Sequence, residues 1–143
     1  MTKDRPCNHR RRVLLLGGLA LAATPARAEE TPEAFMARAF ALRDQALSAG
    51  DQGYGAVVVQ DGALVGLGPS RVVTASDPTA HAEMEAIRDG AKRLGTRGLS
   101  GAVMYSSSRP CPMCEAAAYW AGIGRLVYGR ALTEGGQPRL SRC

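Results

Sequence analysis

One histidine, one glutamate and two cysteines in the middle of this chain have the types and spacing of a metal centre. His81 and Glu83 lie two residues apart, and Cys111 and Cys114 lie three apart, so both sulfurs can face one point at the start of a helix. Four protein ligands close a structural zinc site, whereas three leave a position for water. The pattern therefore predicts a zinc site with three protein ligands, beside which Glu83 carries protons.

Two helix starts are expected to bring these residues together. The amides and dipole at a helix N-terminus favour thiolates, and the prolines on either side of Cys111 suit a first helical turn. A second helix is predicted over roughly residues 81–94, with Asp77 or Thr79 as its N-cap. The histidine and the glutamate would then lie at the start of that helix, next to the cysteines.

A thiol redox motif is the alternative for Cys111 and Cys114, since C-x-x-C alone is also common in redox proteins. That alternative leaves His81 and Glu83 without a role, so the metal site is favoured. Cys143 is the odd cysteine and is predicted to be a free terminal thiol.

Several segments resemble a known family beyond the zinc motif. Residues 77–88 (DPTAHAEMEAIR) resemble the zinc-ligand helix of the cytidine and deoxycytidylate deaminase superfamily, in particular its guanine deaminase and tRNA-adenosine deaminase branch. Residues 111–114 (CPMC) and 118–121 (AYWA) are similar to bacterial guanine deaminases, and residues 54–62 resemble the first hairpin of the family. The resemblance extends from about residue 33 to residue 129.

The resemblance implies an α/β fold, a three-layer α/β/α sandwich around a mixed sheet, shortened at its C-terminus and assembled as a homo-oligomer such as a dimer. It implies Zn²⁺ held by His81, Cys111 and Cys114, with Glu83 as the catalytic proton carrier. The implied reaction is hydrolytic deamination of a nucleobase or nucleoside, with a guanine-like purine favoured and ammonia released. The positions implied for contact with the substrate are Ser70, Ala82, Tyr119 and Trp120.

Three departures from the family pattern keep another function open. Ser70 stands where the family has an asparagine, Arg109 stands where it has a glutamate, and only residues 130–143 follow the predicted strand at 125–129. A serine hydroxyl cannot copy the paired donor and acceptor of an amide. One alternative is therefore a zinc-binding, catalytically weak relative. A separate alternative, which fits the resembling branch, is deamination of adenosine in tRNA.

The first residues are typical of an export signal. Arg10-Arg11-Arg12 precedes an apolar run at 13–23 and the small-x-small site Ala26-Arg27-Ala28. Consecutive arginines next to an apolar run resemble a twin-arginine signal, and eleven apolar residues are too few for a stable membrane span. We therefore expect a signal peptide at 1–28, a deaminase-like domain at 29–129 and a short tail at 130–143. The mature protein would be periplasmic, or cytoplasmic if the leader does not function.

The distribution of charge argues against a nucleic-acid partner. The chain has 18 Lys and Arg and 13 Asp and Glu, a formal net charge of +5. Six of the basic residues and one of the acidic residues lie within 1–28, which leaves equal numbers of each in the remainder. Because a phosphate-binding surface is expected to be basic, we expect a small-molecule substrate rather than RNA.

Predicted helices and strands alternate along the remainder, which is typical of α/β layer folds. The predicted elements are a helix at 32–49, a hairpin of strands 54–60 and 63–68, the helix at 81–94, a strand at 101–105, a helix at 111–121 and a strand at 125–129. Three serines at 106–108 are expected to be solvated loop residues. The strand at 125–129 is expected to leave an exposed sheet edge, which dimerisation could cover.

Overall fold

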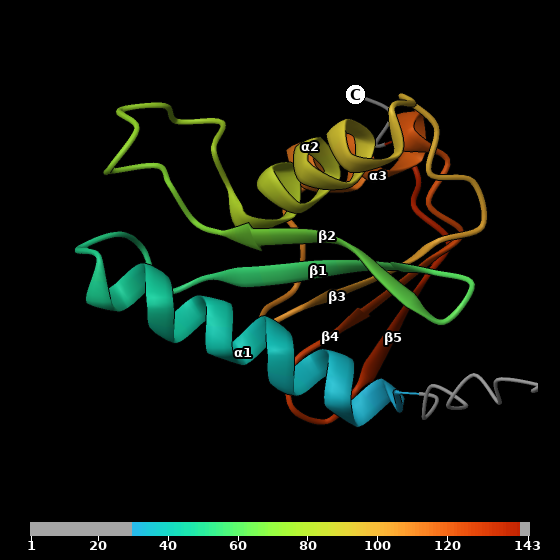
Figure 1. Ribbon diagram of the computed structural model, residues 1–143, viewed down its shortest axis with the longest axis horizontal. Helices are drawn as coiled ribbons and strands as arrows, with labels where there is room; N and C mark the ends of the chain where they lie inside the picture. The colour runs from blue at the N-terminus through green and yellow to red at the C-terminus, as the bar shows by residue number, and fades with distance from the viewer. Residues whose placement is uncertain (1–29, 141–143) are drawn as a thin grey trace, which may run out of the picture.

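A mixed five-stranded sheet forms the middle layer of the protein, and helices cover both of its faces (Figure 1). The computed structural model describes residues 30–140, so the predicted signal peptide at 1–28 and Cys143 lie outside the described residues. The elements, in chain order, are α1 (Pro32–Ser48), β1 (Gly55–Gln60), β2 (Ala63–Pro69), α2 (Ala82–Leu94), β3 (Val103–Ser106), α3 (Pro112–Ala121), β4 (Arg125–Tyr128) and β5 (Thr133–Gly136).

The strands are ordered β2-β1-β3-β4-β5 across the sheet. Only the β3–β4 pair is parallel, and α3 forms the crossover between these two strands; the other neighbouring pairs are antiparallel. The predicted two-residue turn joins β1 to β2: Asp61 and Gly62 both have positive φ, 50° and 71°, as a tight hairpin turn of the primed type requires. The predicted α/β sandwich around a mixed sheet is confirmed.

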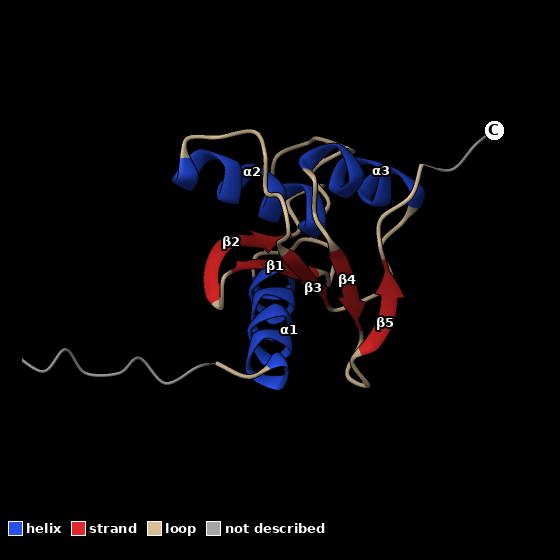
Figure 2. Ribbon diagram, turned by 90° about the vertical axis from the view of Figure 1, so that its right-hand side faces the viewer, coloured by secondary structure: helices blue, strands red, loops and turns tan. Residues whose placement is uncertain are grey.

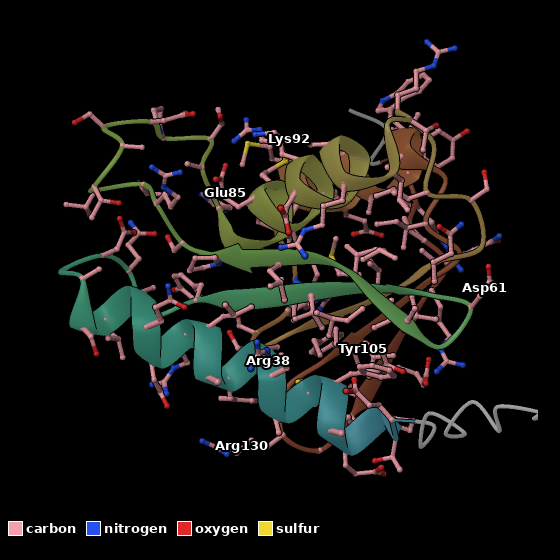
Figure 3. The ribbon with its side chains drawn as sticks, viewed as in Figure 1. Arg38, Asp61, Glu85, Lys92, Tyr105 and Arg130 are labelled. Atoms are coloured by element: carbon pink, nitrogen blue, oxygen red, sulfur yellow. The ribbon has the colours of Figure 1, made fainter. Side chains whose placement is uncertain are left out.

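The sheet lies between α1 on one face and α2 and α3 on the other (Figure 2). Two apolar clusters hold these three layers together, one on each face of the sheet. Successive residues of a strand point to opposite faces, so Val57 of β1 packs towards α1 and Val58 packs towards α2 and α3. Tyr105 of β3 lies between the sheet and α1 (Figure 3), where its ring centre is 5.5 Å from that of Phe35. The polar face of α1 is turned to solvent, as its amphipathic pattern predicts.

Helix α2 lies unusually close to β2, because two glycines of that strand present no side chain to it. A Cβ atom added to Gly68 would overlap the carbonyl oxygen of Ala82, and one added to Gly66 would overlap that of Ala86. The backbones of strand and helix are therefore in direct contact. This contact sets the height of α2 above the sheet, and α2 begins at the predicted metal ligand.

The C-terminal edge of the sheet differs from the sequence-based expectation. Residues 125–129 were expected to form an exposed edge, but β5 pairs with β4 and is itself the edge strand of the described residues. Glu134 of β5 lies 3.5 Å from Arg125 of β4. The connection between the two strands also contacts α1, since the guanidinium of Arg130 lies 4.1 Å from the ring centre of Phe40. The expected tail thus contains a strand.

None of the helices formed by residues 30–140 is both long and apolar enough to cross a membrane.

Candidate active site

The three predicted metal ligands converge at one point. Nδ1 of His81 lies 3.7 Å from Sγ of Cys111 and 3.6 Å from Sγ of Cys114, and the two sulfurs are 3.6 Å apart. With zinc–sulfur and zinc–nitrogen bonds of about 2.3 and 2.0–2.1 Å, tetrahedral coordination places such ligand atoms about 3.6–3.8 Å apart. The three ligand atoms therefore fit a zinc ion, which would keep one coordination position free of protein ligands.

The starts of two helices hold these ligands. His81 is the N-cap of α2 and Cys111 is the N-cap of α3, and neither side chain makes a capping hydrogen bond. The prediction that Asp77 or Thr79 caps α2 was wrong. The backbone amide and the hydroxyl of Thr79 instead donate to the Asp77 carboxylate, 2.8 and 2.7 Å away, which closes a local turn before the helix. The imidazole of His81 therefore remains available to a metal.

Glu83 lies directly beside the three ligands and is 4 % exposed. Its Oε2 is 3.5 Å from Sγ of Cys114, and its Oε1 accepts a hydrogen bond of 2.8 Å from the hydroxyl of Ser106. The expectation that Ser106 is a solvated loop residue was wrong, because it is the buried last residue of β3. Ser106 thus fixes the Glu83 carboxylate through Oε1, and Oε2 is directed at the metal ligands.

The protonation state of Cys114 depends on the cation that this site could hold. Burial raises the pKa of the Cys114 thiol above its ordinary value, and the nearby carboxylate of Glu83 and the second sulfur, Cys111, add to the effect. A coordinated divalent ion reverses this balance, because its charge outweighs the neighbouring negative groups and the thiol ionises. The Cys114 thiol is therefore expected to ionise only when a metal ion is bound.

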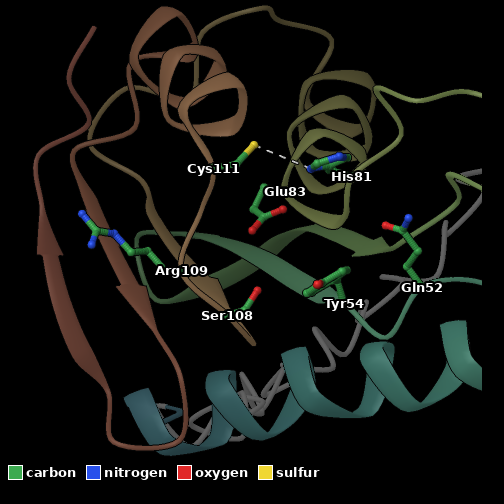
Figure 4. A pocket seen from close by; sticks show the side chains of 7 residues that line it. All are labelled: Gln52, Tyr54, His81, Glu83, Ser108, Arg109 and Cys111. Carbon is green, nitrogen blue, oxygen red and sulfur yellow. Dashed lines mark hydrogen bonds between the residues drawn. The ribbon is translucent and has the colours of Figure 1, made fainter. Parts of the chain in front are cut away.

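A pocket of about 570 Å³ opens over these residues (Figure 4). Its lining residues are Gln52, Tyr54, His81, Glu83, Ser108, Arg109 and Cys111. Four of these residues are neither metal ligands nor the proton carrier, and two loops supply them. Gln52 and Tyr54 come from the α1–β1 loop, and Ser108 and Arg109 come from the β3–α3 loop. No motif marks Gln52 or Tyr54 as functional, and Ser108 was expected only as a solvated loop residue; their place just before β1 or just after β3 is the one signal they carry.

Arg109 stands where the resembling family has a glutamate, and it does not extend towards the metal ligands. Its side chain is directed away from Glu83, to the side on which β4 and β5 lie (Figure 4). There it also lines a smaller cavity of about 150 Å³ with Glu115 and Glu134. The reversed charge is therefore at the rim of the pocket, close to carboxylates of the neighbouring elements.

The four residues predicted to contact the substrate lie outside the set that lines the pocket. Ser70 is 2 % exposed, and Ala82 is buried in the apolar cluster under α2 and α3. Tyr119 and Trp120 form an edge-to-face pair on α3 with ring centres 5.4 Å apart, and Trp120 is 75 % exposed. Their contact with a substrate stays a prediction, whereas the metal ligands and Glu83 come together as expected.

Asp51 fixes the loops beside the pocket, a role that the sequence analysis missed. Its carboxylate is 7 % exposed and accepts five hydrogen bonds of 2.7–3.0 Å. The donors are the amides of Gln52, Val73 and Thr74 and the hydroxyls of Ser70 and Thr74. Burial favours the neutral acid, but the hydrogen bonds from Thr74, Ser70 and Gln52 outweigh it and hold the pKa of Asp51 well below its usual value.

Comparison with known proteins agrees with the metal-ligand geometry of this site. Residues 29–130 match the model of the cytidine and deoxycytidylate deaminase zinc-binding region. The chain is 44% identical to guanine deaminase from Bacillus subtilis over 103 residues, which are 71% of this chain and 66% of that protein. It is 40% identical to the tRNA-specific adenosine deaminase of Haemophilus influenzae over 101 residues, 70% of this chain and 58% of that protein. The chain thus spans less than two thirds of either relative.

The crystal structure of the Bacillus subtilis guanine deaminase superposes with a TM-score of 0.67 at 39% identity, covering 76% of this chain and 73% of that one. A guanine deaminase structure from Nitrosomonas europaea also superposes with a TM-score of 0.67, at 30% identity, covering 71% of this chain and 60% of that one.

Proposed function

The chain belongs to the cytidine and deoxycytidylate deaminase family, and from this membership we propose that it is a zinc-dependent hydrolytic deaminase of a nucleobase or nucleoside. The reaction replaces an exocyclic C–NH₂ group of the ring by C=O, consumes one water and releases ammonia. A guanine-like purine is the favoured substrate, since the Bacillus subtilis relative at 44% identity and the Nitrosomonas europaea structure at 30% identity are both named guanine deaminases.

One observation carries this proposal: a buried carboxylate is held against a three-ligand metal site at the base of a pocket. Glu83 is within 3.5 Å of Cys114, and His81 and Cys111 line the same pocket as Glu83. The thiol redox alternative needs only the two cysteines and gives no reason for the histidine and the carboxylate beside them. A proton carrier next to a Lewis-acid site is the arrangement that hydrolysis requires.

His81, Cys111 and Cys114 would hold the zinc ion. When bound there, zinc supplies the Lewis acidity that lets water attack a ring carbon near neutral pH. Glu83 accepts the proton that the water loses, and Oε2 is the oxygen we assign to this step because Oε1 is bonded to Ser106. Glu83 passes that proton to the ring nitrogen beside the attacked carbon. It then moves the proton of the new hydroxyl to the amine, so that the C–N bond breaks and ammonia leaves.

The pocket supports a small substrate. A volume of about 570 Å³ lies within the range typical of small-molecule sites and accommodates a base or a nucleoside. The pocket is also lined by few charges beyond those of the site, since Arg109 is the one cationic side chain in its lining among the described residues.

Deamination of adenosine in tRNA is the second candidate. It is supported by the 40% identity to the tRNA-specific adenosine deaminase of Haemophilus influenzae. Against it stands the balance of acidic and basic residues after position 28, because RNA binding depends on clustered positive charge. We therefore place it behind the small-molecule reaction.

Ammonia release by the zinc-loaded protein, measured across purines, pyrimidines, their nucleosides and a tRNA, tests the proposal. We expect release from one class of small substrate. The Glu83→Gln variant should keep its zinc and lose about 10²–10⁴-fold in rate, the usual contribution of a general acid–base group. Silence across the panel with one zinc per chain would instead support a catalytically weak relative, and release from tRNA alone would support the second candidate.

We also propose, from the N-terminal sequence, that residues 1–28 direct export through the twin-arginine route to the periplasm. From the resemblance to the family, we propose that the mature protein is a homodimer. Mass spectrometry of the periplasmic fraction and light scattering on the purified protein test these two points. A mature N-terminus at Glu29 and the mass of two chains are expected.

A further inference from the structure

The carboxamide of Gln52 is a polar group of the pocket that neither the metal site nor the proton steps use. Gln52 lines the pocket together with His81, Glu83 and Cys111. Its side chain is exposed, and its carboxamide makes no hydrogen bond to another residue in the described range 30–140. An amide offers a donor and an acceptor side by side, which no other side chain in this lining does.

The serine predicted to contact the substrate does not compete for this role. The hydroxyl of Ser70 donates a hydrogen bond of 2.8 Å to Oδ1 of Asp51, and its amide donates to the carbonyl of Tyr54 at 3.0 Å. Ser70 is buried and is absent from the pocket lining. Its polar groups therefore serve the attachment of the loops and not the binding of a ring.

The same carboxylate that holds Ser70 also holds the backbone of Gln52. The amide of Gln52 donates to Oδ1 of Asp51 at 2.7 Å, and the carbonyl of Gln52 accepts from the amide of Tyr54 at 2.8 Å. Asp51 is fixed in turn by Thr74 and Val73 of the β2–α2 connection. The carboxamide of Gln52 is thus a free side chain on a fixed backbone, so that binding has to order its rotamers but not the loop that carries it.

The position of Gln52 suits contact with a substrate ring whose amine lies at the metal site. Gln52 and Tyr54 lie on one side of the pocket, and Ser108 and Arg109 lie on the other (Figure 4). The carboxamide of Gln52 extends from the α1–β1 loop into the part of the pocket where His81 lies (Figure 4). A ring placed with its amine beside Glu83 would present another edge to the α1–β1 loop.

We propose that Gln52 selects the substrate by pairing its carboxamide with a lactam edge of the ring, through a hydrogen bond from Nε2 to the ring C=O and one from the ring N–H to Oε1. The chemical class so selected is a purine that carries both an amino group and a lactam, as guanine does. This inference rests on the proposed deaminase function and adds a substrate-reading residue to it.

Binding rather than turnover provides the test. Guanine and 2-aminopurine are titrated into zinc-loaded Glu83→Gln protein, with and without Gln52→Leu. Both probes carry the same exocyclic amine, but 2-aminopurine lacks the lactam. We expect Gln52→Leu to weaken guanine binding about 10- to 100-fold, the usual effect of losing two hydrogen bonds at a polar site, and to change 2-aminopurine binding less than about twofold. Gln45→Leu, the same change on the exposed side of α1, should alter neither.

The outcomes separate this inference from the proposed function. Equal losses for both probes, an unchanged affinity for guanine, or no guanine binding to protein that retains Gln52 would overturn the role of Gln52, even if ammonia release is observed. Selective loss of guanine binding together with silence in the ammonia assay would support the reading role and contradict catalysis. Thermal melting of Gln52→Leu should match the parent protein, since the side chain is exposed.

Discussion

The hydroxyl of Ser106 donates a hydrogen bond of 2.8 Å to Oε1 of Glu83, which joins the last residue of β3 to the first turn of α2. Both side chains are buried. A carboxylate with one oxygen bonded in this way has a fixed orientation, and its second oxygen points to the metal ligands. Ser106 is therefore a positioning residue in the proposed mechanism.

Replacement of this hydroxyl should reduce turnover without loss of metal. We expect Ser106→Ala to lower kcat by about 10- to 100-fold, with KM and zinc content little changed, because groups that orient a catalytic side chain have effects of that size. The measurement is steady-state kinetics together with metal analysis. Ser107→Ala is the matched control: the Ser107 hydroxyl accepts from the amide of Gly55 and does not touch Glu83. A larger loss of kcat in the control would contradict the assigned role.

The close contact of β2 with α2 predicts intolerance to a single methyl group. Gly68→Ala should lower the free energy of unfolding by at least about 2 kcal/mol, because the new Cβ would overlap the carbonyl of Ala82 and only a shift of strand or helix relieves it. Zinc affinity should fall as well, since that shift moves the start of α2. Chemical denaturation and zinc titration measure the two effects. Gly98→Ala, whose Cβ would meet one side-chain atom at 3.9 Å, should be nearly neutral.

Removal of zinc should destabilise the fold. The three ligands join the starts of α2 and α3, and an ion that binds only the folded state stabilises it by mass action. We expect a chelator to lower Tm by about 10 °C or more in the zinc-loaded protein. Scanning calorimetry with and without chelator measures this shift. The chelator should have little effect on Cys114→Ser; an unchanged Tm in the parent protein would exclude a stabilising role of the metal.

The pH dependence of stability should report on Asp51. Its pKa is lower in the folded protein than in the unfolded chain, so its stabilising effect is present above the unfolded value of about 3.9 and is lost as pH falls below it. Asp51→Asn should therefore melt several degrees lower at pH 7, and the gap to the parent protein should narrow below about pH 4. Asp44→Asn, at an exposed ion pair on α1, should show no such gap at either pH.

The metal ligands and the proton carrier could be predicted because short spacings determine them. His81 and Glu83 belong to one helix start, and Cys111 and Cys114 belong to another, so local geometry already brings each pair to one face. The alternation of helices and strands likewise follows from local apolar patterns and turn residues such as Asp61 and Gly62.

The remaining features depend on contacts between distant parts of the chain. The hydrogen bond between Ser106 and Glu83 joins residues 23 positions apart in the sequence, and so does the one between Thr74 and Asp51. Local sequence patterns do not predict contacts over such separations. Strand β5 has the sequence TEGG and no buried residue, so no apolar alternation marks it; its pairing with β4 defines it. The capping residue of α2 was missed because Asp77 and Thr79 satisfy each other instead.

The glycines of β2 have a consequence for how this protein can change over evolution. Backbone contact at Gly66 and Gly68 sets the height of α2, whereas Gln52, Tyr54, Ser108 and Arg109 enter the pocket from two loops. Substitutions in those loops leave this backbone contact in place, because it depends only on the two β2 positions that have no room for a side chain. We therefore expect a library randomised at the four loop positions to vary the lining of the pocket while the start of α2 keeps its place over the sheet.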